Sequence, residues 1–161
     1  MAPMARKLNE NERIMHELVL NWKLRLVASA LFSMLGLAFL TGTVSGFFVD
    51  LTTLDKSIVG IAVFVVMIPI YLIIADLPKI NEFTIASMLN EAVPEFDQQA
   101  ELVLNPVEEL SEDEIEKRKQ LEEVLKEKKL YRFLPNRPIK QAIAVMLISL
   151  SLTAGSYFIF M

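Results

Sequence analysis

The sequence contains no cysteine among its 161 residues. Disulfides, thiolate catalysis, cysteine-ligated iron–sulfur clusters and thiolate zinc sites are therefore excluded. Histidine is almost as scarce, because His16 is the only one. A Ser-His-Asp triad would have to use this imidazole, which has no His, Cys or Asp cluster near it in the sequence. We interpret His16 as a surface or interfacial residue.

Phosphate loops and membrane-embedded charges are also missing. All five glycines lie in apolar stretches, so the sequence has no Gly-rich phosphate loop: Gly36, Gly42, Gly46, Gly60 and Gly155. The same stretches lack the ionisable residues that mark ion paths and proton relays. The sequence thus argues against a transporter, an ion pump or an intramembrane protease acting alone. We interpret the acidic residues 112–116 as an exposed helix start, and we expect no metal, no cofactor and no catalytic residue.

Long apolar runs dominate the rest of the chain, at residues 26–49, 57–75 and 141–161. Each is close to the roughly 20 residues that a helix needs to cross about 30 Å of hydrocarbon. We predict an all-α membrane protein with three transmembrane helices, a hairpin plus one, and a helical cytoplasmic segment at residues 76–140 between the second and third. The first run follows a long polar leader, residues 1–25, so we interpret it as a signal anchor rather than a cleaved signal peptide.

The basic residues predict the orientation. Five lie in the leader, one lies in the turn at residues 50–56, and ten lie in residues 76–140. The positive-inside rule then places the N-terminus and the middle segment in the cytoplasm of a bacterial inner (plasma) membrane, and the C-terminus on the extracytoplasmic side. Trp22, Lys23 and Arg25 are expected to anchor the chain at the membrane interface.

The chain ends at Met161, inside the third apolar run. A C-terminal span usually closes with interfacial or charged residues. We therefore expect an extracytoplasmic part to follow. The alternative is a short protein whose C-terminus lies flush with the membrane.

The leader has the pattern of an amphipathic helix. Asn9 and Glu12 have capping-box spacing, and the apolar residues after them share one helical face: Met15, Leu18, Val19 and Trp22. Three placements are open for this helix. It lies on the inner leaflet, runs straight into the first span, or packs against the cytoplasmic helices.

The middle segment carries three helix signals. Asn81 is expected to cap a helix over residues 82–92, Pro94 to begin a second helix that ends before Pro106, and Ser111 with Glu114 to begin a long charged helix. The charged helix has three i,i+4 pairs, Asp113–Lys117, Glu114–Arg118 and Glu122–Lys126. The side chains expected to dock a partner are Phe96, Leu102, Leu104, Leu121 and Leu125.

Small residues mark one face of the first span. Ala38, Gly42 and Gly46 recur every four residues, a pattern that lets a second backbone approach closely. This helix-packing face fits another helix of the same chain, or a partner or second copy. Pro69 is expected to kink the second span.

The order of these elements resembles that of a known family. The motif is an alanine-bearing helix, a Pro-Glu step and a leucine-rich helix, carried by Ala86, Leu89, Pro94, Glu95, Phe96, Glu101, Leu102 and Leu104. It is similar to the N-terminal membrane region of large bacterial membrane proteins found near genes for MoxR-type AAA+ ATPases and von Willebrand A-domain proteins. The resemblance implies an AAA+ ATPase as a partner and no catalytic residues. The large extracytoplasmic part of that family is not in this sequence.

These observations predict a non-catalytic membrane scaffold or assembly subunit. Its cytoplasmic helices would dock a membrane or cytoplasmic subunit, and its spans would pack in a complex with lipids, other subunits or a second copy, without nucleic acid. The alternative is a lipid- or substrate-handling subunit of a transporter or membrane enzyme.

Overall fold

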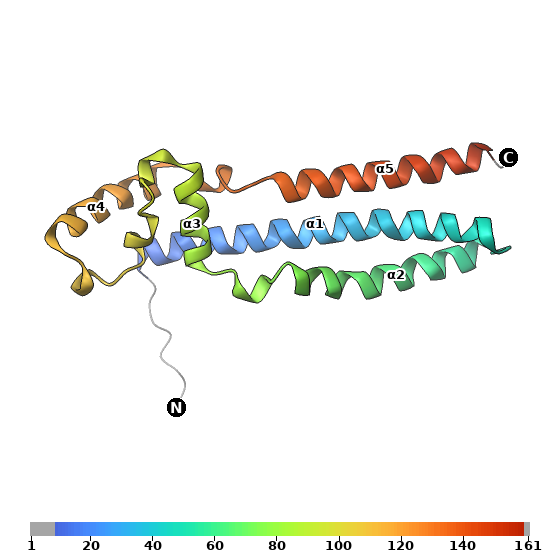
Figure 1. Ribbon diagram of the computed structural model, residues 1–161, viewed down its shortest axis with the longest axis horizontal. Helices are drawn as coiled ribbons and strands as arrows, with labels where there is room; N and C mark the ends of the chain where they lie inside the picture. The colour runs from blue at the N-terminus through green and yellow to red at the C-terminus, as the bar shows by residue number, and fades with distance from the viewer. Residues whose placement is uncertain (1–8, 160–161) are drawn as a thin grey trace, which may run out of the picture. The chain divides into compact units, whose positions relative to one another are not determined.

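The computed structural model of the chain describes residues 9–159, and the side chains of residues 9–156. Over these residues it contains α-helices and short 3-10 turns, without a strand. The residues divide between two compact units, which we call the polar unit (residues 9–23 and 78–135) and the apolar unit (residues 24–77 and 136–159). Helix α1 (Glu10–Phe48) is continuous and contributes its first turns to the polar unit and the rest to the apolar unit (Figure 1).

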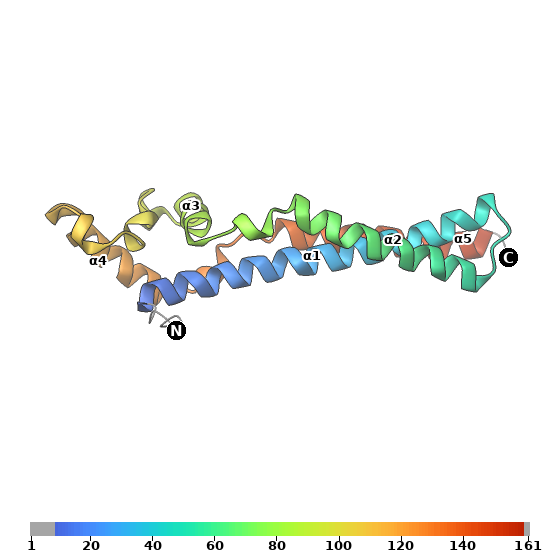
Figure 2. The same ribbon diagram turned by 90° about the horizontal axis from the view of Figure 1, so that it is seen from below.

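The apolar unit consists of the later part of α1 together with α2 (Thr53–Ile74) and α5 (Arg137–Ile159). Within this unit α1 lies between α2 and α5 in Figure 1, and the three run alongside one another in Figure 2. The three helices are long and apolar enough to cross a membrane. The predicted all-helical class and the three membrane-length helices are thus confirmed.

Two helices of the apolar unit begin earlier than the hydropathy pattern predicts. Helix α2 begins at Thr53 because Thr52 forms a capping box with Asp55. The Asp55 N–H donates to the Thr52 hydroxyl at 3.3 Å, and the Thr52 N–H donates to the Asp55 carboxylate at 3.0 Å. Helix α5 begins at Arg137 with Pro138 in its first turn, where proline is tolerated. Helix α2 continues through Pro69, although proline removes one backbone hydrogen bond.

The leader forms the start of α1 and is not a separate element. Glu12 accepts a hydrogen bond from the backbone N–H of Asn9 at 2.9 Å, as the capping spacing predicts. The four apolar residues of the predicted face are all buried: Met15, Leu18, Val19 and Trp22. The helix therefore runs straight into the first apolar run, and its apolar face is covered by the chain itself.

The polar unit has its own core. Helix α3 (Glu82–Ala92) begins after Asn81, and α4 (Glu112–Glu127) begins after Ser111, so the predicted Asn81 cap and the predicted Ser111–Glu114 capping box are confirmed. Two 3-10 turns, Pro94–Phe96 and Ala100–Val103, pack against both helices. Their side chains meet in a core that includes Ile85, Leu89, Val93, Phe96, Val103, Leu121 and Leu125.

The predicted helix from Pro94 to Leu104 is wrong. Asp97 and Gln98 have φ values of 46° and 58°, in the left-handed region, so a right-handed helix cannot continue through them. The side-chain carbonyl of Asn90 instead accepts the N–H of Ala100 at 2.8 Å, which fixes the second turn to α3. Phe96, Ala100 and Val103 of these turns are nevertheless buried, whereas Leu104 is half-exposed.

Candidate functional site

The small-residue face of α1 lies against α2. A Cβ added to Gly42 would lie 2.7 Å from the backbone oxygen of Lys56, and one added to Gly46 would lie 2.3 Å from the Cε of Lys56. A Cβ on Gly60 of α2 would lie 3.0 Å from the backbone oxygen of Ala38. The two backbones are therefore close enough to exclude side chains, as small-residue packing requires. Of the occupants left open by the sequence, the chain's own α2 covers this face.

The other side of α1 lies against α5. A Cβ on Gly36 would lie 2.8 Å from the Cα of Met146 and 3.3 Å from the hydroxyl of Ser149, which is buried. Gly36 falls outside the four-residue repeat of Ala38, Gly42 and Gly46, so sequence spacing gave no signal for it. Near the start of α5, Arg25 donates a hydrogen bond to the side-chain oxygen of Asn136 at 2.8 Å.

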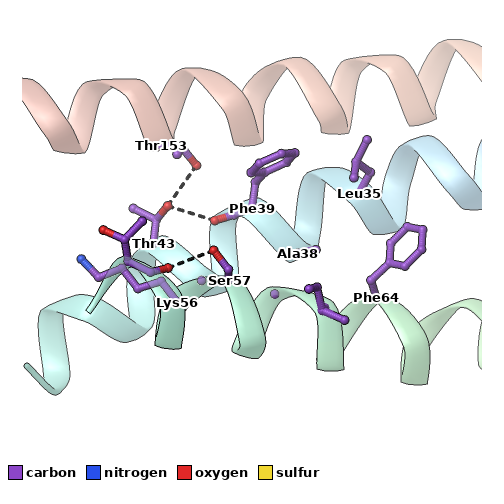
Figure 3. Close-up of a pocket in the computed structure, with 12 residues that line it drawn as sticks. Leu35, Ala38, Phe39, Thr43, Lys56, Ser57, Phe64 and Thr153 are labelled. Atoms are coloured by element: carbon purple, nitrogen blue, oxygen red, sulfur yellow. Dashed lines mark hydrogen bonds between the residues drawn. The ribbon is translucent and has the colours of Figure 1, made fainter. Parts of the chain in front are cut away.

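A cavity of about 460 Å³ lies among α1, α2 and α5 (Figure 3). One end is lined by the polar residues Thr43, Thr53, Lys56, Ser57 and Thr153. The other end is apolar, with Leu35, Phe39, Ile61 and Phe64. Sequence analysis missed this site because its lining comes from three helices that are far apart in the chain.

Lys56 gives the polar end its charge. Its Nζ lies beside Gly46, 2.7 Å from where a Cβ on that glycine would be. Among the residues that the structure describes, its side chain has no hydrogen-bond or ion-pair partner. The hydroxyls around it are partly engaged, since Ser57 donates to the Thr53 carbonyl and Thr43 donates to the Phe39 carbonyl, both at 2.9 Å. The polar end therefore holds an ammonium group that forms no ion pair with the described residues.

The predicted membrane-interface anchors are divided between the units. Trp22 is 6% exposed, so its indole ring is covered by the chain. Lys23 is half-buried, and Arg25 binds Asn136 as described above. Their role as anchors at the headgroup level stays a prediction.

The predicted docking residues fall into two groups. Phe96, Leu121 and Leu125 are at most 2% exposed, so they form the core of the polar unit and do not face outward. Leu102 and Leu104 are half-exposed. Leu104 lies beside a groove of about 270 Å³ whose lining includes the exposed Val107 and the carboxylates of Glu12 and Glu108. This groove was not predicted, because it forms where the chain turns before α4.

Two lysines of α4 form ion pairs with acidic residues of other elements. Lys117 binds Asp97 at 2.7 Å and holds the pKa of that carboxyl below its ordinary value. Lys126 binds Glu10 at 2.8 Å. Among the described residues Asp113–Lys117 and Glu114–Arg118 form no ion pair, whereas the Glu122 charge does act on Lys126 at i,i+4. Such exposed pairs contribute little to stability and mainly fix geometry.

Arg118 is the buried cation of α4, at 7% exposed. Its Nε donates to the Glu122 carboxylate at 2.9 Å, and its guanidinium also donates to the backbone oxygen of Asn105. A buried charge is tolerated only when it is paired and hydrogen-bonded, as here. Arg118 thus ties α4 to the loop that precedes it, a role that its sequence position did not reveal.

His16 and Glu82 form a second contact between elements of the polar unit. The His16 Nδ1 lies 3.1 Å from the Glu82 carboxylate, and this hydrogen bond lowers the pKa of Glu82. Among the described residues, no group of three or more histidine and acidic side chains could hold a metal ion. The contact joins α1 to α3 and has the geometry of a structural pair.

No known family model matches the sequence, and no curated protein or solved structure is significantly similar to it. The resemblance to the bacterial membrane-protein family therefore stays a prediction.

Proposed function

We propose that the chain is a non-catalytic scaffold or assembly subunit of the bacterial inner membrane, with its N-terminus and polar unit in the cytoplasm. The observation that carries the proposal is a polar unit with its own buried core in a chain with three membrane-length helices. A unit that covers its own apolar residues can present a fixed surface to a partner. The distribution of lysine and arginine supports the orientation.

The groove beside Leu104 is the proposed docking surface. Val107 is 47% exposed there and Leu104 is half-exposed, so an apolar anchor has side chains to contact. Glu12 and Glu108 give the groove an acidic border. Arg118 also lines it, but its charge is engaged by Glu122. The surface fits an apolar segment flanked by basic residues, because opposite charges at a rim favour association.

An AAA+ ATPase of the MoxR type is the proposed cytoplasmic partner. It is implied by the resemblance of residues 86–104, and the groove supplies a surface on which it could bind. The spans would connect this partner to other membrane subunits or to an extracytoplasmic element. The scaffold would act through geometry alone.

The test is co-purification with the ATPase in mild detergent. We expect wild type to retain the ATPase in a stoichiometric complex, and Leu104→Asp to lose it. Phe83→Asp is the matched control, because Phe83 is 53% exposed on α3 and does not line the groove. Phe96 is unsuitable, because a charge at this fully buried position would unfold the polar unit.

Two results of this co-purification test would contradict the proposal. Equal retention by Leu104→Asp and wild type would refute docking at the groove. A chain that co-purifies with lipid but with no protein partner would contradict the scaffold and favour the lipid- or substrate-handling alternative.

A further inference from the structure

We propose that the cavity among α1, α2 and α5 binds one anionic phospholipid, with its phosphate at Lys56 and an acyl chain along Phe39, Ile61 and Phe64. This inference goes beyond the scaffold function, which requires no bound lipid. The cavity volume of about 460 Å³ lies within the ~300–1,000 Å³ of typical ligand pockets. The ligand class follows from the order of side chains along it.

The cavity changes from polar to apolar along the helices (Figure 3). Thr53, Lys56 and Ser57 lie in the first turns of α2, and Ile61 and Phe64 lie further along the same helix. At ~1.5 Å per residue, Thr53 and Phe64 are roughly 16 Å apart along the helix axis. A headgroup followed by an acyl chain has the same order of polar and apolar parts.

The positive charge of Lys56 favours a negatively charged ligand. An ammonium without a counterion at the edge of a membrane is costly, and lysine reduces this cost by extending toward the headgroups. The carboxylate nearest in sequence is Asp55, which accepts hydrogen bonds from the Thr52 N–H and hydroxyl at 3.0 and 2.7 Å. Asp55 is thus engaged in starting α2. A phosphate group would supply the charge that Lys56 lacks.

The apolar side chains fit an acyl chain better than a second copy of the protein. Leu35, Phe39 and Ile61 are 41%, 48% and 63% exposed, so they border a groove that a flexible chain can enter. A second copy would bring another Lys56 and the same unbalanced charge. The lipid instead fills the groove and neutralises the lysine.

The first experiment compares lipid retention by native mass spectrometry. The protein is taken from nanodiscs of phosphatidylglycerol or of phosphatidylcholine with the same acyl chains. We expect wild type to retain one phosphatidylglycerol and to lose phosphatidylcholine. Lys56→Gln should retain phosphatidylglycerol at least about tenfold less, since a hydrogen bond to a charged group contributes about 1.5–3 kcal/mol. The control Lys140→Gln removes an exposed lysine outside the cavity and should behave as wild type.

The second experiment uses the unchanged chain and needs no folded variant. The amine of Lys56 is labelled with an acylating reagent in each nanodisc, and the modified site is found by peptide mass spectrometry. Protection of Lys56 in phosphatidylglycerol relative to phosphatidylcholine, with Lys140 labelled equally in both, supports the site. Equal labelling of Lys56 in the two lipids overturns it, as does equal retention of both lipids by wild type. Protection in both lipids in a dimeric protein would assign the cavity to a second copy and also overturn the proposal.

Discussion

Substituting the glycines with alanine tests the helix packing of the apolar unit directly. Gly42 and Gly155 both lie in membrane-length helices, but only Gly42 faces a close neighbour. The new Cβ at Gly42 would lie 2.7 Å from the Lys56 backbone oxygen, whereas no atom of the described residues lies within 4 Å of a Cβ at Gly155. Gly155→Ala is therefore the matched control for Gly42→Ala.

The expected magnitude follows from these distances. Ordinary C···O contacts are about 3.3 Å or longer, so the backbones at Gly42 must separate by roughly 0.6 Å. Overpacking of this kind costs about 1–3 kcal/mol. Both substitutions gain up to about 1 kcal/mol of helix propensity, which cancels in the comparison. We expect Gly42→Ala to be less stable than Gly155→Ala by about 1–3 kcal/mol, or about 2–12 °C in Tm for a chain of this size.

The assay is thermal unfolding in detergent, followed by the loss of monodisperse protein on size-exclusion chromatography. Gly46→Ala should lie between the two, because its Cβ meets the flexible end of the Lys56 side chain and not backbone. Equal Tm values for Gly42→Ala and Gly155→Ala would refute the close approach of α1 and α2. If Gly42→Ala left the isolated chain intact and only weakened a complex, the face would belong to a partner.

Two further predictions concern the polar unit. Arg118→Ala should lower the free energy of unfolding of this unit by about 1–3 kcal/mol, because the Asn105 carbonyl and Glu122 lose a buried donor. The control Lys119→Ala should change it by no more than about 0.5 kcal/mol. Equal effects of the two substitutions in denaturant titrations would contradict the role of Arg118. The contact with His16 lowers the pKa of Glu82 below its ordinary value of 4.5. This contact should therefore stabilise the fold above pH 4.5, and the stabilisation should be lost as the pH falls through the lowered pKa. Glu82→Gln should remove this loss of stability in acid, and an unchanged dependence of stability on pH would count against the contact.

Local signals in the sequence predict much of this fold. Helices α3 and α4 begin where the capping patterns at Asn81 and Ser111 place them, since a cap depends on residues three apart. The same pattern at Thr52 and Asp55 begins α2 at Thr53, inside the predicted turn at residues 50–56. Capping geometry therefore locates α2 better than hydropathy does.

Contacts between distant residues are the part that sequence spacing does not predict. Lys117 has an acidic residue four positions before it, yet it binds Asp97 across the polar unit. The two left-handed residues before Ala100 are polar and give no periodic signal, so the predicted helix there is replaced by turns. The cavity at Lys56 likewise depends on three helices meeting, which no local pattern encodes.

The proposed orientation, with the turn between α1 and α2 outside the membrane and α4 in the cytoplasm, is the central claim, and the absence of cysteine makes it directly measurable. Asp50→Cys lies in the turn between α1 and α2, and Gln120→Cys lies on α4; both positions are exposed. A membrane-impermeant maleimide applied to spheroplasts should label Asp50→Cys at once and Gln120→Cys only after lysis. Labelling of Gln120→Cys in intact spheroplasts with protection of Asp50→Cys would contradict the proposed orientation.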